Sequence, residues 1–230
     1  MGRPWQAARM EPTNEPIPLD LASFQDRDKA LELAAYGCPK LYTDVAAKHL
    51  MDRKVLTVGS MLFESFVSRM RGLHEGAIRE IAANNPHAAL PLQRAWIEIT
   101  TIALYILRKP DYVDLVAHGP GEGRPARKSF ASMFHAVQAD APGLARVYAQ
   151  LSDYTHFGKL GVWNIHTPDA DDPRRVSWTD APRWRDDEHF QAACAQAHEL
   201  AVGSLDVLDR LGELLISDHE ETEVAHAKPV

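Results

Sequence analysis

The sequence has few cysteines and no excess of positive charge, and each shortage excludes a class of protein. Its 2 cysteines, Cys38 and Cys194, have no CxxC spacing and predict neither a disulfide framework nor a zinc site. They favour a reducing, cytoplasmic setting. The formal net charge of −7 argues against broad binding to the phosphate backbone of DNA.

Long apolar segments are also missing. The longest apolar stretch, 97–107, is interrupted by Glu98 and Tyr105 and is shorter than the roughly 20 residues of a membrane span. We therefore expect no membrane partner. The first residues, MGRPWQAARM, lack the apolar core of a secretory signal.

Helical periodicity runs through most of the chain. Apolar residues at steps of three and four predict helices at 20–36, 41–84, 88–108, 126–139, 142–157 and 186–216. The helix at 88–108 is apolar nearly all round and should be central. On 41–84, apolar spacing predicts one buried face made of Val58, Met61, Leu62, Ser65, Phe66, Arg69, Met70, Leu73, Ala77 and Ile81. The expected fold is all-α, a bundle of long antiparallel helices.

The domain boundaries follow from composition. Residues 1–18 are rich in proline, and 218–230 are charged, so we expect a disordered arm and a disordered tail around one domain at 19–217. The helix at 186–216 has a stripe of small and apolar residues. A neighbouring helix could approach it closely, or it could join two copies in a homodimer.

Residues 159–180 break the helical pattern. The segments KLGVWNIHT and RRVSW alternate and predict a β-hairpin insertion. Trp163, Trp178 and Trp184 surround it, and we expect them to pack it against the bundle. The alternative is an exposed surface for a partner or ligand.

The segment LSDYTHFG at 151–158 places polar groups at the end of a helix. Ser152 and His156 are four residues apart and share a face with Tyr148. His156 and Gly158 could simply cap the helix. Alternatively, His156 points inward and the polar end forms one wall of a small pocket.

Arg94 and Glu98 are also four residues apart, on the central helix. A partly buried pair seldom exists for stability alone, because desolvating two charges costs several kcal/mol. The alternative is a solvated edge, where a pair contributes a few tenths of a kcal/mol. In a pocket, Glu98 could receive a proton from His156 and Arg94 could hold a small anionic ligand.

These two helices together resemble a group of uncharacterised bacterial proteins in the wider HEPN-like set. The shared pattern is Arg-x-x-x-Glu followed by Tyr-x-x-Leu-Ser-x-x-x-His, here Arg94, Glu98, Tyr148, Leu151, Ser152 and His156. It covers about 85–160. The resemblance implies a helical bundle whose polar residues meet between helices. Some HEPN relatives are metal-independent ribonucleases or toxins in defence modules, which makes RNA a candidate partner.

The ribonuclease signature of that set, an Arg followed after four to six residues by a His, is absent from the resembling helices. Arg69…His74 and Arg183…His189 have the spacing but lie elsewhere. The chain could therefore be a HEPN-like bundle of unknown activity in a stress or phage-defence module. It could also be an RNA- or nucleotide-directed enzyme, or a homo-oligomeric interaction protein.

Two other chemistries lack their patterns. A di-iron bundle needs two Glu-x-x-His motifs on helices, and Glu223…His226 is the only one. We therefore expect no metal and no cofactor. A Ser–His hydrolase needs a G-x-S-x-G elbow, which does not surround Ser152.

Overall fold

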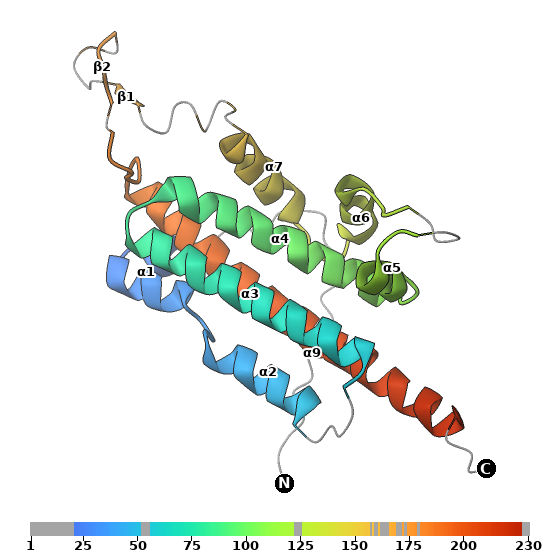
Figure 1. The fold of residues 1–230 in the computed structure, drawn as a ribbon. Coiled ribbons are helices and arrows are strands. Elements are labelled where there is room, and N and C mark those ends of the chain that lie inside the picture. The colour runs from blue at the N-terminus through green and yellow to red at the C-terminus, as the bar shows by residue number, and fades with distance from the viewer. Residues whose placement is uncertain are drawn as a thin grey trace.

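A computed structural model shows a bundle of α-helices with a short hairpin at one end (Figure 1), which confirms the expected all-α fold. The structure describes residues 21–51, 56–121, 126–156, 158, 161, 166–168, 172, 174–178 and 180–226. None of the helices in these ranges is both long enough and apolar enough to cross a membrane.

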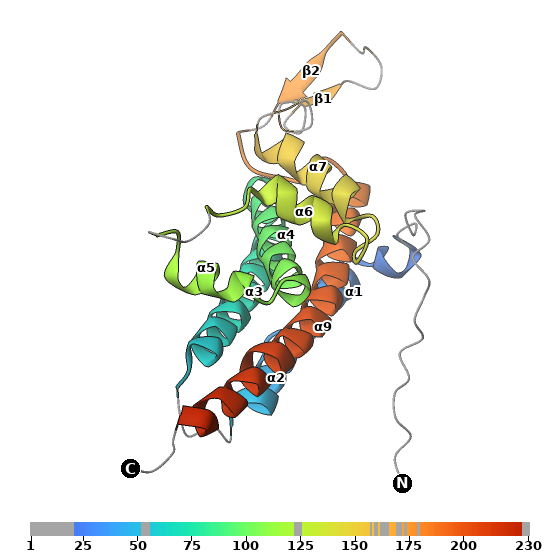
Figure 2. The same ribbon diagram turned by 90° about the vertical axis from the view of Figure 1, so that its right-hand side faces the viewer.

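Three long helices form the centre of the bundle: α3 (Val58–Ala82), α4 (Pro86–Arg108) and α9 (Asp187–His226). The shorter helices are η1 (Leu21–Phe24), α1 (Arg27–Ala34), α2 (Lys40–Leu50), α5 (Tyr112–His118), α6 (Phe130–Val137) and α7 (Leu144–Thr155). Helices α1 and α2 pack against α3 and α9 on one side, while α6 and α7 cover α4 on the other (Figures 1 and 2). The core lies between α3, α4 and α9.

Local signals set the ends of the central helices. At the start of α3, the Thr57 hydroxyl accepts from the Ser60 N–H at 3.1 Å, and the Ser60 hydroxyl accepts from the Thr57 N–H at 2.9 Å. This reciprocal capping box satisfies two N–H groups that the helix leaves free. Helix α4 begins at Pro86, where the missing N–H of proline costs no helical bond. It ends shortly before Pro110, because a proline disfavours helical geometry in the residue before it.

Helix α9 buries its predicted stripe inside the bundle. The stripe residues are at most 9 % exposed: Ala193, Ala197, Leu200, Ala201, Ser204, Leu205, Leu208, Leu211 and Leu215. Because the neighbouring helices cover this stripe, it is not open to a second copy of the chain.

The described chain ends differ from the expected boundaries. Helix α9 continues to His226, so the first part of the expected tail is helical. No glycine or proline lies between Gly212 and Pro229 to stop it. The expected arm at 1–18 and the last residues, 227–230, lie outside the described residues.

The expected helix at 41–84 is two helices, α2 and α3, and its predicted buried face is confirmed in part. Phe66, Met70, Ala77 and Ile81 lie in the core as expected. Val58 and Met61, in the first turn of α3, are 39 % and 53 % exposed, so the prediction is wrong there. Phe63, which the predicted face left out, is fully buried, because an aromatic side chain offers a large apolar area to the core.

A two-stranded hairpin lies within the predicted insertion. Strand β1 (His166–Pro168) pairs antiparallel with β2 (Val176–Trp178), with His166 opposite Trp178. The hairpin extends away from the helices in both views (Figures 1 and 2). Trp178 is 68 % exposed, so the expectation that it packs the hairpin against the bundle is wrong.

Trp184 behaves differently because it follows the hairpin and enters the core. It is 7 % exposed. Its indole N–H donates to the Ile81 carbonyl at 3.4 Å, and its ring meets Phe190 edge-on. This tryptophan anchors the segment before α9, while Trp163 lies outside the described residues.

Candidate functional site

Three of the five expected pocket residues meet where α7 crosses α4. Arg94 Nη2 lies 3.0 Å from Glu98 Oε1. The Tyr148 hydroxyl on α7 donates to the same Glu98 oxygen across 3.0 Å and accepts from Arg94 Nη2 at 3.2 Å. These three groups form a closed triangle, named here the Arg94–Glu98–Tyr148 triangle, that joins the two helices.

The triangle is partly buried. This is intermediate between the two environments expected for the Arg94–Glu98 pair, a desolvated pocket and a solvated helix edge. The side chains of Arg94 and Glu98 are 20 % and 36 % exposed. The Tyr148 ring lies 4.9 Å from the Phe130 ring and 5.3 Å from the Phe134 ring, both on α6. The triangle therefore combines a charge pair with an aromatic contact and ties α6 and α7 to α4.

Within the described residues, two buried polar atoms near the triangle have no hydrogen-bond partner. They are Arg94 Nε and Ser152 Oγ. Helix α7 runs antiparallel to α4, because its Tyr154 hydroxyl lies 2.9 Å from His87 Nδ1 near the start of α4. Ser152 therefore lies on the Arg94 side of Tyr148. Buried polar atoms normally have a partner, so each of these two atoms is a local cost to the α4–α7 contact.

His156 does not join the triangle, and the prediction that it points inward is wrong. The residue is exposed, and within the described ranges its ring makes no ion pair or hydrogen bond with Arg94 or Glu98. Instead, its backbone N–H donates to the Ser152 carbonyl at 2.9 Å as the C-cap of α7. Eight residues of helix separate it from Tyr148, about 12 Å, which places it beyond the reach of the triangle.

The end of α7 is therefore a cap rather than a pocket wall. The Gly158 N–H donates to the Asp153 carbonyl at 2.7 Å, the six-to-one bond of a Schellman motif. An added Cβ at Gly158 would lie 2.8 Å from that carbonyl oxygen. The close approach of two backbone segments explains the glycine.

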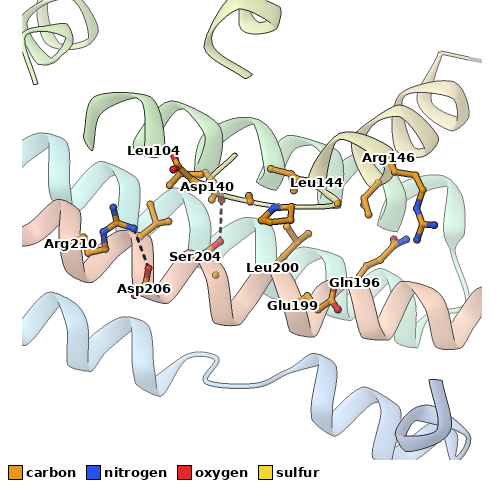
Figure 3. A pocket seen from close by; sticks show the side chains of 17 residues that line it. Leu104, Asp140, Leu144, Arg146, Gln196, Glu199, Leu200, Ser204, Asp206 and Arg210 are labelled. Carbon is orange, nitrogen blue, oxygen red and sulfur yellow. Dashed lines mark hydrogen bonds and ion pairs between the residues drawn. The ribbon is translucent and has the colours of Figure 1, made fainter. Parts of the chain in front are cut away.

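A groove runs between α7 and α9, with α4 as its floor. Among the described helices, α7 packs closely against α4 but not against α9. The two walls of the groove, α7 and α9, therefore stand apart. One cavity of about 310 Å³ lies near the start of α7 (Figure 3). A second, of about 340 Å³, lies near the end of α7 and the start of α9. Gln196 lines both cavities, which makes them neighbouring parts of one groove, named here the α7–α9 groove.

The first cavity has apolar walls above a pair of hydroxyl groups. Its apolar lining includes Leu104, Leu144, Val147, Leu200 and Val207. The Thr100 hydroxyl donates to the Trp96 carbonyl at 2.9 Å. Because a hydroxyl has one proton, Ser204 must donate in the 3.1 Å bond between Ser204 and Thr100. The Ser204 oxygen then remains an acceptor at the floor of the cavity.

Gly203 gives the first cavity part of its width. It lines the cavity, and an added Cβ there would meet no atom within 4 Å. A glycine inside a helix costs about 0.5–1 kcal/mol relative to alanine. No close helix contact accounts for it here, so its effect is to leave space in the groove.

The second cavity is lined by the aromatic side chains Tyr154 and Trp184 and by His189. His189 Nδ1 lies 2.6 Å from Asp186 Oδ1, and the His189 backbone N–H donates to the same oxygen at 2.9 Å. Burial opposes the charged form of Asp186, but these two bonds prevail and lower its pKa. Asp186 therefore caps α9 and orients the His189 ring.

The structure offers little for metal or thiol chemistry. In the described ranges, no three His, Cys, Asp or Glu side chains gather in a metal-binding cluster. Both cysteines are free thiols. Burial raises the pKa of Cys38 to about 11 and that of Cys194 to about 12, so both stay protonated at neutral pH and are weak nucleophiles.

No family model, curated protein or solved structure matches the chain. The resemblance to the HEPN-like set therefore stays a prediction. The α7–α9 groove was not predicted from the sequence, although Gly203 inside an apolar helix was a signal for it.

Proposed function

We propose that the protein binds a small molecule with an apolar body in the α7–α9 groove. One observation carries the proposal: α7 packs against α4 and stands away from α9, which leaves a lined hollow instead of a closed helix contact. Pockets for small ligands are typically concave, mostly apolar and equipped with a few polar groups. The first cavity has this character, with five aliphatic side chains and an accepting hydroxyl at Ser204.

We also propose that the chain is a HEPN-like bundle that acts in the cytoplasm as part of a stress or phage-defence module. Support comes from the Arg94–Glu98–Tyr148 triangle, because the resemblance implies that these residues meet between helices. A test is to express the protein in bacteria and measure phage plating with the wild type and with Arg94→Met. Equal plating for both and for cells without the protein would contradict the defence role.

The groove itself is tested with an apolar fluorophore, N-phenyl-1-naphthylamine, titrated into purified protein. Gly203→Leu should abolish binding, because the new side chain enters the first cavity. It should not reduce stability, because leucine favours a helix more than glycine does. The matched control is Gly72→Leu, also inside a helix and also with no atom within 4 Å of an added Cβ. Gly72 belongs to α3 and lines a separate hollow between α2 and α3, so its variant should bind like the wild type.

Two results would contradict a ligand groove at this place. One is unchanged binding in Gly203→Leu. The other is loss of binding in Gly72→Leu with retention in Gly203→Leu, which would move the site to the α2–α3 side. Melting temperatures of both variants exclude loss of fold as the cause.

A metal-independent ribonuclease is the second candidate, favoured by the partly exposed charge pair of the Arg94–Glu98–Tyr148 triangle. Purified protein would be incubated with RNA in the presence of a chelator. Cleavage should be lost in Arg94→Met and unchanged in His156→Ala, whose exposed side chain lies away from the triangle. Equal cleavage by the wild type and both variants would assign the activity to a contaminant.

A further inference from the structure

The charged residues around the first cavity are mostly paired with one another. Five line it: Asp140, Arg146, Glu199, Asp206 and Arg210. Asp140 is held by Arg108 from outside the cavity, with Nε and Oδ2 2.8 Å apart. Arg210 Nη1 lies 3.5 Å from Asp206 Oδ2. Of the five charged residues that line the cavity, one cation and one carboxylate remain to be assigned a partner.

The remaining two are Arg146 and Glu199. In the part of the chain that the structure describes, neither makes an ion pair or a side-chain hydrogen bond. Arg146 belongs to α7 and Glu199 to α9, so they come from opposite walls of the groove (Figure 3). Arg146 extends beside Gln196 in this view, and the Gln196 amide can both donate and accept.

The surroundings of Glu199 disfavour its isolated charge. Burial raises the pKa of its carboxyl, and the nearby His198 opposes this only in part. The Glu199 residue itself is exposed, so a cation that enters the groove can reach its carboxylate. The groove thus has an unmatched cation on one wall and an unmatched acid on the other.

We propose that the α7–α9 groove binds a small zwitterion with an apolar body, such as an aromatic amino acid. The ligand carboxylate contacts Arg146, its ammonium group contacts Glu199, and its apolar part lies among Leu104, Val147 and Leu200. A simple anion would leave Glu199 unmatched, and a simple cation would leave Arg146 unmatched. The inference rests on the proposed ligand groove and adds the chemical class of the ligand.

The size of the cavity limits the ligand. About 310 Å³ is at the lower end of small-molecule pockets, which span roughly 300–1,000 Å³. A single amino acid fits within the first cavity, which Arg146 and Glu199 line, whereas a nucleotide or an oligopeptide would extend into the second. The apolar walls favour a large apolar side chain over a polar one.

Four indole compounds separate the charge contributions by isothermal titration calorimetry. Tryptophan has both charges, indole-3-propionate only the carboxylate, tryptamine only the ammonium group, and indole neither. Tryptophan should bind to the wild type at least about tenfold more tightly than each of the other three, the effect of about one charge-assisted hydrogen bond.

Two variants assign each charge to its wall. Arg146→Met should weaken tryptophan and indole-3-propionate about tenfold and leave tryptamine and indole unchanged. Glu199→Gln should weaken tryptophan and tryptamine and spare the other two. Both residues are exposed, so both variants should melt within a few degrees of the wild type. Arg174→Met, an exposed arginine of the hairpin region, is the control and should change nothing.

The failures of the two proposals are distinguishable. If N-phenyl-1-naphthylamine binds in a Gly203-dependent manner but tryptophan does not bind at millimolar concentration, the groove stands and the zwitterion is wrong. Equal affinities for tryptophan and indole, or equal effects of Arg146→Met on all four compounds, would also overturn it. If neither the fluorophore nor any indole compound depends on Gly203, the ligand groove itself is wrong.

Discussion

The Tyr148 hydroxyl donates its proton to Glu98 across 3.0 Å and so connects α7 to the central helix α4. The same hydroxyl oxygen accepts a hydrogen bond from Arg94. One hydroxyl on α7 thus contacts both members of a charge pair on α4. This hydroxyl is therefore a sensitive point for the groove wall.

Tyr148→Phe should destabilise the protein by about 1 kcal/mol, because it removes two hydrogen bonds and keeps the aromatic ring. Urea unfolding followed by circular dichroism measures this. The control is Tyr105→Phe, since within the described residues the Tyr105 hydroxyl makes no hydrogen bond although its ring also packs against a neighbour, Tyr112. Equal effects of the two variants would show that the Tyr148 hydroxyl contributes nothing.

A double-mutant cycle with Arg94→Met and Glu98→Gln should give a coupling free energy of about 1 kcal/mol. This is less than for a sealed pair, because the two side chains are 20 % and 36 % exposed. The matched control is Arg71–Glu75, also four residues apart, at 2.7 Å and with exposures of 42 % and 38 %. Its coupling should be only a few tenths of a kcal/mol. A control pair as strong as the Arg94–Glu98 pair would remove any special role for the triangle.

Truncation of Trp184 should destabilise the protein far more than truncation of Trp178. Trp184→Ala should cost about 3–5 kcal/mol, because it empties a core position and breaks the bond to Ile81. Trp178→Ala should cost less than about 0.5 kcal/mol, because the side chain is 68 % exposed. A large loss of stability in Trp178→Ala would mean that the hairpin folds back onto the bundle.

His74 should make the protein less stable in mild acid. Its ring is fully buried and stacks on Trp96 with centroids 4.5 Å apart. Burial lowers its pKa from 6.5 and His198 adds to this, while the bond to the Ala34 carbonyl and the charge of Glu75 oppose it. The unfolded chain therefore binds a proton more readily than the native protein does. The free energy of unfolding should be constant above about pH 6.5 and fall below it.

Urea unfolding at about pH 7.5 and about pH 5.5 measures this dependence in the wild type and in His74→Gln. The variant should be less stable at both values but should lose most of the difference between them. His156→Gln, at an exposed position, should keep the wild-type dependence. A pH dependence that survives in His74→Gln would assign it to another group.

The apolar pattern predicted a buried helix face correctly where many residues of that face supported it. On α9 the buried stripe repeats over many turns, and a wrong face would have exposed several leucines at once. On α3 the predicted face is buried at Phe66 and Ile81 but exposed at Val58 and Met61, where few repeats of the pattern support it. Arg94 and Glu98 were paired correctly because a single helix fixes their spacing.

The rest of the site depended on how helices are placed against one another. His156 shares a face with Tyr148 in sequence, yet antiparallel packing carries it away from Arg94. The α7–α9 groove exists because two helices do not touch, and no periodicity in either sequence encodes a missing contact. Gly203 was visible as an unusual residue, but its meaning needed the positions of α4 and α7.

The attachment of α7 to α4, without close packing on α9, divides the molecule into parts that should open at different rates. Amide protons of α7 should exchange with solvent through a local opening that leaves α3, α4 and α9 folded, whereas those of the central helices should require global unfolding. A molecule bound in the groove would contact α7 and the central helices together and so oppose this local opening. It should therefore slow exchange of the α7 amides more than exchange of the amides in α3, α4 and α9.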